Sequence, residues 1–152
     1  MKGSEEIRNE KGNGRLVEEI FRDAKFVHAL GIELVDFGLG WCETKMPKAA
    51  ALEQQHGFVH AGALMTLADH TCGMAAATTV PEGRDVITVE NKVSFLRPAS
   101  GQEMLCRATV LRSGKTLVFV EAEIVVEREG KKVIVAKASS TLAVISRQSP
   151  TS

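Results

Sequence analysis

The stretch 54–81 is almost free of charge: its 28 residues carry one formally charged side chain, Asp69. Within it, 61–79 has the length of a helix but none of the Lys, Arg and Glu that a surface helix turns to water. A helix that is apolar all round must be buried, and a buried carboxylate is costly unless it is paired or used in chemistry. Asp69 is therefore the first candidate catalytic residue. The alternative is a thin solvent-facing stripe that Asp69 shares with Thr66 and His70.

Composition limits the class of protein. The chain has 152 residues, enough for one domain with a real core. Nineteen basic and nineteen acidic residues balance, so charge gives no case for nucleic acid or a membrane as a partner. Three cysteines without Cys-x-x-Cys spacing favour a reducing compartment, and we expect a cytoplasmic protein. We expect a disordered N-terminal lead over 1–14, a single domain over 15–146 and a C-terminal tail over 147–152.

The hydrophobic pattern predicts an α+β fold. Apolar residues recur at helical spacing over 16–28, with Gly31 as a C-terminal cap, and the long apolar helix begins near His60. The other runs have strand-like composition and short connections, which favour antiparallel neighbours; they are 32–37, 41–46, 85–96, 103–111, 116–127 and 131–145. We predict a curled antiparallel sheet wrapped around one long buried helix. One sheet of this size leaves a side of the helix uncovered, so we expect a homodimer, or a dimer of dimers.

The run from His60 to Asp69, His-Ala-Gly-Ala-Leu-Met-Thr-Leu-Ala-Asp, resembles the His-Gly-Gly and Asp signature of the hotdog-fold acyl-CoA thioesterases of the phenylacetate-degradation (PaaI-like) type. The likeness extends over residues 26–145. It includes shorter matches at 30–32, 46–47, 86–98 and 113–116. The resemblance implies the hotdog fold and hydrolysis of an acyl-CoA to a free carboxylic acid and coenzyme A.

The resemblance also implies roles for individual residues. Asp69 would attack the thioester carbonyl or act as general base for water, and Thr88 would assist it. The backbone N–H groups of Ala61 and Gly62 would hold the thioester oxygen at the helix start, next to the signature histidine, His60. From its position near the helix start alone, we expect His60 to fix the loop. Gln54 matches a residue, often Asn in the family, that orients the water or the carbonyl. Ala61 itself stands where the family usually has glycine. In such sites the carboxylate and the oxyanion hole come from different subunits.

The substrate contacts follow from the same likeness. The turn Arg112-Ser113-Gly114-Lys115-Thr116 would contact the nucleotide end of coenzyme A, joined by Arg97; without the resemblance it reads as an ordinary hairpin with solvated cations. Coenzyme A is part of the substrate, and no separate cofactor is expected. We expect a medium-chain or aryl acyl group, bounded by large apolar side chains such as Phe58, Leu64, Met65, Met74 and Phe95.

Three alternatives remain open from the sequence. His56 and His60 are four residues apart, a spacing that places two imidazoles on one metal if both lie on one helical turn, but Gly57 indicates a loop and we expect no metal. A hotdog hydratase or dehydratase would need His56 or His60 to face Asp69. A non-catalytic acyl-CoA-binding module would use the same pocket without turnover. No Gly-x-Ser-x-Gly motif supports a serine hydrolase.

Overall fold

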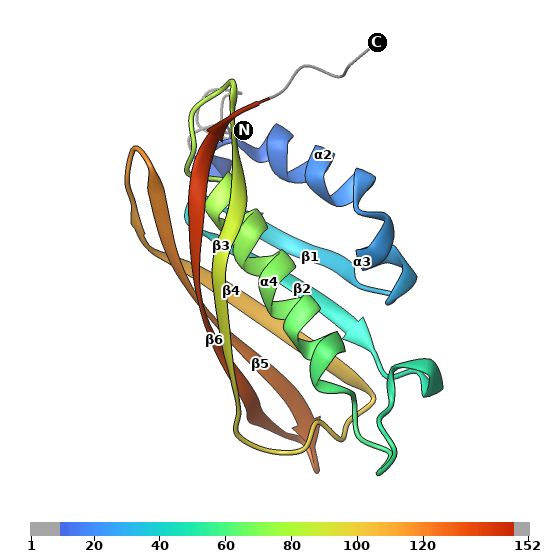
Figure 1. Cartoon of the computed structure of the whole chain (residues 1–152). Helices are drawn as coiled ribbons and strands as arrows, with labels where there is room; N and C mark the ends of the chain where they lie inside the picture. Colours follow the sequence, from blue (N-terminus) through green and yellow to red (C-terminus); the bar gives the residue numbers. More distant parts are fainter. Residues whose placement is uncertain (1–9, 148–152) are drawn as a thin grey trace, which may run out of the picture.

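The structure is a computed structural model that describes residues 10–147. Six antiparallel strands form one sheet that curls along one side of the long helix α4, Ala61–Ala77 (Figure 1). The strand order is β1-β2-β4-β5-β6-β3. The predicted fold class, a curled antiparallel sheet around a long helix, is confirmed. The strands are β1 Glu33–Gly38, β2 Trp41–Pro47, β3 Arg84–Phe95, β4 Glu103–Ser113, β5 Leu117–Arg128 and β6 Lys131–Ser146.

The core lies between α4 and the inner face of the sheet. Strand β5 shows the alternation clearly: from Val118 to Ile124 every second residue is buried, and the residues between these are exposed. The side of α4 that faces the sheet carries only small or apolar groups and one hydroxyl, that of Thr71, which is hydrogen-bonded to the hydroxyl of Thr44 over 2.6 Å. This packing explains why the helix has no charged residue on that side.

The N-terminal helical segment differs from prediction. The expected single helix over 16–28 is two helices, α2 (Gly14–Asp23) and α3 (Lys25–Ala29). At Ala24 the backbone has ψ of 74°, outside the helical region, so the chain turns and Val27 becomes buried. Gly31 has φ of +72° just after α3, as expected for a C-terminal cap.

The ends of the chain lie partly outside the described residues. The described residues exclude most of the predicted lead, residues 1–9, and most of the predicted tail, residues 148–152. From Glu10 the chain is described, and Asn13 N–H donates to the carbonyl of Thr78 over 2.9 Å, so this stretch is tied to the end of α4. A short 3-10 helix, Ala50–Leu52, precedes the loop that leads into α4.

One side of the protomer is uncovered. β3 is an edge strand of twelve residues with Ile87 56% and Val89 63% exposed. Beside it, α4 presents a stripe of residues that are not buried by the sheet; they are Ala61, Gly62, Met65, Thr66, Asp69, His70 and Gly73. α2 and β3 flank the upper half of α4, and its lower half is open (Figure 1). The helix is therefore not buried on all sides within one protomer.

Candidate active site

Asp69 lies half-buried in the middle of the α4 stripe, where Thr88 of β3 reaches it. The Thr88 hydroxyl donates a hydrogen bond to Asp69 Oδ1 over 2.9 Å. Thr88 stands at a β-bulge, since the register with β6 shifts between Thr88 and Glu90, and such bulges re-aim side chains next to active sites. The structure thus brings together the two residues for which the resemblance implied a shared role. The bond holds one carboxylate oxygen and leaves Oδ2 without a hydrogen-bond partner among residues 10–147.

A hollow of about 300 Å³ opens at this pair. Its lining comes from α2, α4, β3 and β6 and consists of Ile20, Asp69, His70, Gly73, Asp85, Val86, Thr88 and Leu142. Of these, the sequence identified only Asp69 and Thr88 as site residues. The helical period gave a signal for one more, because Gly73 lies four residues after Asp69 and so shares its face.

His60 fixes the start of α4. It is the N-cap residue, with φ −62° and ψ 140°, and its ring Nδ1 accepts a hydrogen bond from Gly62 N–H over 2.8 Å. The predicted role of His60 in holding the loop fits this contact. It also uses the Gly62 N–H, which was expected to belong to the oxyanion hole. The N–H of Ala61 has no hydrogen-bond acceptor within the described part of the chain, so it is the free donor at the positive end of the helix.

Gln54 belongs to the loop before α4. Its side-chain oxygen accepts a hydrogen bond from His56 N–H, and its backbone is paired with Phe58. Gln54 and the helix start line a second hollow, of about 470 Å³, together with apolar side chains and Arg97. Phe58, Leu64 and Phe95, expected around the acyl chain, also lie here. Met65 is on the open stripe and lines neither hollow, and Met74 is fully buried in the core rather than beside a pocket.

The residues predicted to contact coenzyme A lie at two ends of the sheet. The turn that contains Lys115 follows β4 and lies near the start of β3. The carbonyl of Thr116 accepts a hydrogen bond from Val144 N–H, and Val144 is the β6 residue that pairs with Val86 of β3. Arg97 follows the other end of β3, eleven residues after Val86, which is about 35 Å along an extended strand. Within one protomer the structure does not bring Arg97 next to the turn. Arg97 instead donates to the carbonyl of Ile134 over 2.9 Å.

His70, next to Asp69, is a neutral histidine. Burial lowers its pKa to about 4, with a smaller contribution from nearby His28. Its Nε2 is buried and has no hydrogen-bond partner in the described structure, and its ring lies 6.2 Å from that of Phe21 on α2. His70 therefore stays uncharged near pH 7 and contributes shape rather than charge to the hollow.

The other histidines and the cysteines do not form a metal centre in the part of the chain that is described. His56 lies in the loop and His60 caps α4, so the two are not on one helical turn. No group of three His, Cys, Asp or Glu side chains among residues 10–147 is arranged to hold a metal ion. All three cysteines are free and buried, and burial raises the pKa of the Cys42 and Cys72 thiols to about 12. Among the described residues, no helix has the length and apolar character needed to span a membrane.

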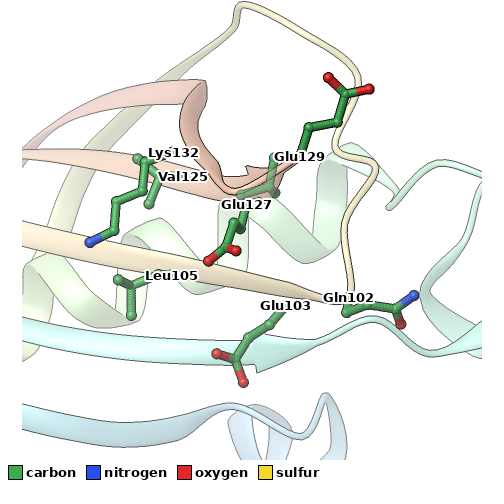
Figure 2. A pocket seen from close by; sticks show the side chains of 8 residues that line it. Gln102, Glu103, Leu105, Val125, Glu127, Glu129 and Lys132 are labelled. Carbon is green, nitrogen blue, oxygen red and sulfur yellow. The ribbon is translucent and has the colours of Figure 1, made fainter.

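A further hollow, of about 370 Å³, lies on the outer face of the sheet, away from α4 (Figure 2). Acidic side chains, Glu103, Glu127 and Glu129, surround it, with Lys132 as its one cation. None of the predicted site residues lines it. Its acidic character makes it unsuited to the phosphates of coenzyme A.

Comparison with known proteins agrees with this geometry. The family model of the thioesterase superfamily matches residues 56–133, about half of the chain. A solved thioesterase family protein from Silicibacter pomeroyi is 36% identical, with a TM-score of 0.86 over 90% of this chain and 100% of that one. Mouse acyl-coenzyme A thioesterase 13 is 32% identical over 95 residues, 59% of this chain and 63% of that protein. The PaaI protein of the E. coli phenylacetic acid degradation operon, 23% identical, shares the fold with a TM-score of 0.77 over 88% of this chain and 93% of that one. The resemblance read from the sequence is confirmed: this chain belongs to the thioesterase superfamily, has the hotdog fold and is of the thioester hydrolase class.

Proposed function

We propose that this enzyme hydrolyses an acyl-CoA to a carboxylic acid and coenzyme A, with Asp69 as nucleophile or general base. The observation that carries the proposal is the 2.9 Å hydrogen bond from Thr88 to Asp69 at the mouth of a hollow. Thr88 fixes one carboxylate oxygen, which leaves Oδ2 to attack the carbonyl carbon or to take a proton from water. In the first route the C–S bond breaks as Asp69 forms an acyl anhydride, and water then hydrolyses the anhydride to the free acid and the original carboxylate. In the second route water adds to the carbonyl carbon as Asp69 takes its proton, and the C–S bond then breaks. In both routes the departing thiolate, a good leaving group, takes up a proton that water supplies.

The oxyanion that forms on the thioester needs a donor. Ala61 N–H supports this role because it is unpaired and lies at the positive end of a seventeen-residue helix. Eight residues separate Ala61 from Asp69 on the same helix, which is about 12 Å at the helical rise. One carbonyl cannot contact both groups of one protomer. The proposal therefore requires a homodimer in which Asp69 of one subunit faces the partner's Ala61.

The open side of the protomer supports such a dimer. A long edge strand with exposed Ile87 and Val89 is a pairing surface unless something covers it. If two α4 helices pack antiparallel about a two-fold axis so that residue 69 opposes residue 61, the midpoint falls at residue 65. Met65 occupies that position and is 40% exposed, as a contact at the axis would require.

The same symmetry relates the residues proposed to bind coenzyme A. Antiparallel pairing of β3 with the partner's β3 places the start of one strand beside the end of the other. The turn 112–116 of one subunit and the partner's Arg97 would then lie at one end of the joined sheet, on either side of the substrate. We infer that these cations hold the phosphates of coenzyme A. The three free, buried thiols support a cytoplasmic location.

The test is release of free thiol from short, medium, long and aryl acyl-CoAs by the native enzyme and by Asp69→Asn. The substitution keeps the shape of the side chain and an oxygen for Thr88, but it removes the nucleophile or base. We expect release that is abolished in the variant, with unchanged circular dichroism. Near-normal release by Asp69→Asn would contradict the proposal. Binding without release in the native enzyme would favour the hydratase or the binding module.

A further inference from the structure

Gly73 leaves room in the hollow beside Asp69 that the fold does not need. It lies one helical turn after Asp69 and lines the same hollow. A Cβ atom at this position would meet only Leu142 Cδ2, at 4.0 Å, which is ordinary contact. The backbone is helical and does not require glycine there, and glycine inside a helix is less favourable than alanine. Within one protomer, neither packing nor backbone geometry accounts for the missing side chain.

We propose that the acyl group of the substrate enters this hollow and that Gly73 sets how deep it can go; this rests on the proposed acyl-CoA hydrolysis. The hollow begins at the Asp69 and Thr88 pair, where the carbonyl carbon would sit. Beyond the pair the lining includes three apolar side chains, Ile20 from α2, Val86 from β3 and Leu142 from β6, beside His70 and Asp85. An acyl chain that starts at Asp69 thus runs past Gly73 beneath α2.

Charge determines which arm of the thioester takes this path. Within one protomer the lining of the hollow at Asp69 includes a second carboxylate, Asp85, and no cation, so this hollow is the less suited of the two to the phosphates of coenzyme A. The hollow at the helix start includes Arg97 and no acidic residue. In the antiparallel dimer the partner's copy of that second hollow adjoins Asp69. The coenzyme A arm therefore follows the partner's Arg97, and the acyl arm takes the hollow at Gly73.

This assignment defines the acyl class. Asp85 disfavours an acyl group that ends in a second carboxylate, so the substrate is an uncharged acyl group. At about 30 Å³ for each water-sized group, the hollow of about 300 Å³ holds on the order of ten non-hydrogen atoms. Phe58, Leu64 and Phe95, which the sequence suggested around the acyl chain, would line the coenzyme A arm instead.

The test compares acetyl-CoA with octanoyl-CoA in the native enzyme and in Gly73→Val. Valine fills the floor of the hollow, so kcat/KM for octanoyl-CoA relative to acetyl-CoA should fall by about 10-fold or more, as for lost methylene contacts. Ile20→Ala, on the opposite wall, should shift the ratio the other way. Gly73→Ala serves as the folding control, and its Tm should rise by about 2–4 °C. A ratio that Gly73→Val leaves within about twofold of the native value would overturn the inference.

A binding measurement separates this inference from the proposed function. Calorimetry on Asp69→Asn and on Asp69→Asn with Gly73→Val needs no turnover. Octanoyl-CoA should bind the double variant about 10-fold more weakly than the single variant, and acetyl-CoA should show a smaller change. Equal octanoyl-CoA affinities would overturn the acyl assignment even if the native enzyme releases thiol. A loss of octanoyl-CoA affinity would support it even if the enzyme releases none.

Discussion

Replacing Ala61 by proline should remove the oxyanion donor while preserving the helix. Ala61 is the first residue of α4, where proline is well tolerated because its N–H would have no partner in the helix. The preceding residue, His60, has φ −62° and ψ 140°, the extended conformation that a residue before proline favours. The Ala61 N–H also has no acceptor among the described residues, so the substitution breaks no hydrogen bond there.

The expected effect falls on the chemical step. Loss of one oxyanion donor costs about 10²–10³-fold in kcat, or roughly 2.7–4 kcal/mol of transition-state stabilisation. KM should change much less, because the bond to the ground-state carbonyl is weaker. Stability should stay the same or rise by about 0.4–1 kcal/mol, since proline restricts the unfolded chain.

The assay is steady-state thiol release together with thermal unfolding, and Ala61→Ser is the matched control because it changes the side chain but keeps the N–H. If Ala61→Pro folds normally and its kcat stays within about threefold of the native value, Ala61 is not the donor. Co-expression of Ala61→Pro with Asp69→Asn then tests whether the site is shared. Half of the randomly formed dimers are mixed and each has one intact site, so about a quarter of native activity should return. Activity no higher than that of the separate variants would show that the two groups do not act across subunits.

Four other substitutions test separate parts of the site. Thr88→Val removes the hydrogen bond to Asp69 at nearly constant volume and should lower kcat by about 10–100-fold, as expected for a bond to a charged group; an unchanged kcat would mean that Thr88 does not orient the carboxylate. Met65→Glu places two like charges at the proposed two-fold axis, so light scattering should show a monomer and thiol release should be lost. A stable, active dimer would show that residue 65 does not lie at the axis. For His70, whose pKa burial lowers to about 4, only the unfolded chain takes up a proton as pH falls from 7 to 5. The free energy of unfolding should therefore fall by up to about 2 kcal/mol in the native protein and less in His70→Phe, measured by urea unfolding; equal falls would contradict the argument. Lys115→Ala should raise KM with little effect on kcat, and substrates that lack the nucleotide phosphates should show a smaller rise in KM in the variant than in the native enzyme. An unchanged KM would show that the turn does not bind the substrate.

The sequence predicted the elements of the fold because their patterns are local. The strands follow from runs in which apolar and polar residues alternate, and the long helix follows from the uncharged run. Each predicted strand overlaps an observed one. The break at Ala24 could not be predicted, since both halves of the 16–28 segment share one apolar face and no proline or glycine marks the turn. The use of the Gly62 N–H by His60 depends on a ring orientation, which no spacing encodes.

The lining of the hollow at Asp69 was harder to predict because it joins four elements that are far apart in sequence. Ile20, Asp85 and Leu142 are ordinary members of a helix and two strands, and only the tertiary arrangement brings them to Asp69. The residues proposed to contact coenzyme A were equally hard to place from the sequence. Arg97 and the turn 112–116 lie at opposite ends of the sheet in one protomer, too far apart to contact one ligand. In the proposed dimer, the turn of one subunit and Arg97 of the partner subunit would contact the same ligand.

The uncharged helix that first indicated a site has two separate causes. On the side facing the sheet, charged residues are absent because the core of the protomer packs there, as at Leu67 and Cys72. On the open stripe the protomer supplies no such cover, yet the exposed positions are still Ala61, Gly62 and Met65, and the half-buried Thr66 beside them is also uncharged. Small and uncharged residues on an open helix face are expected where another helix approaches closely, and a charge there would be buried on dimerisation. If the dimer forms as proposed, Asp69 is the one carboxylate on that face because it is the group on which the chemistry depends.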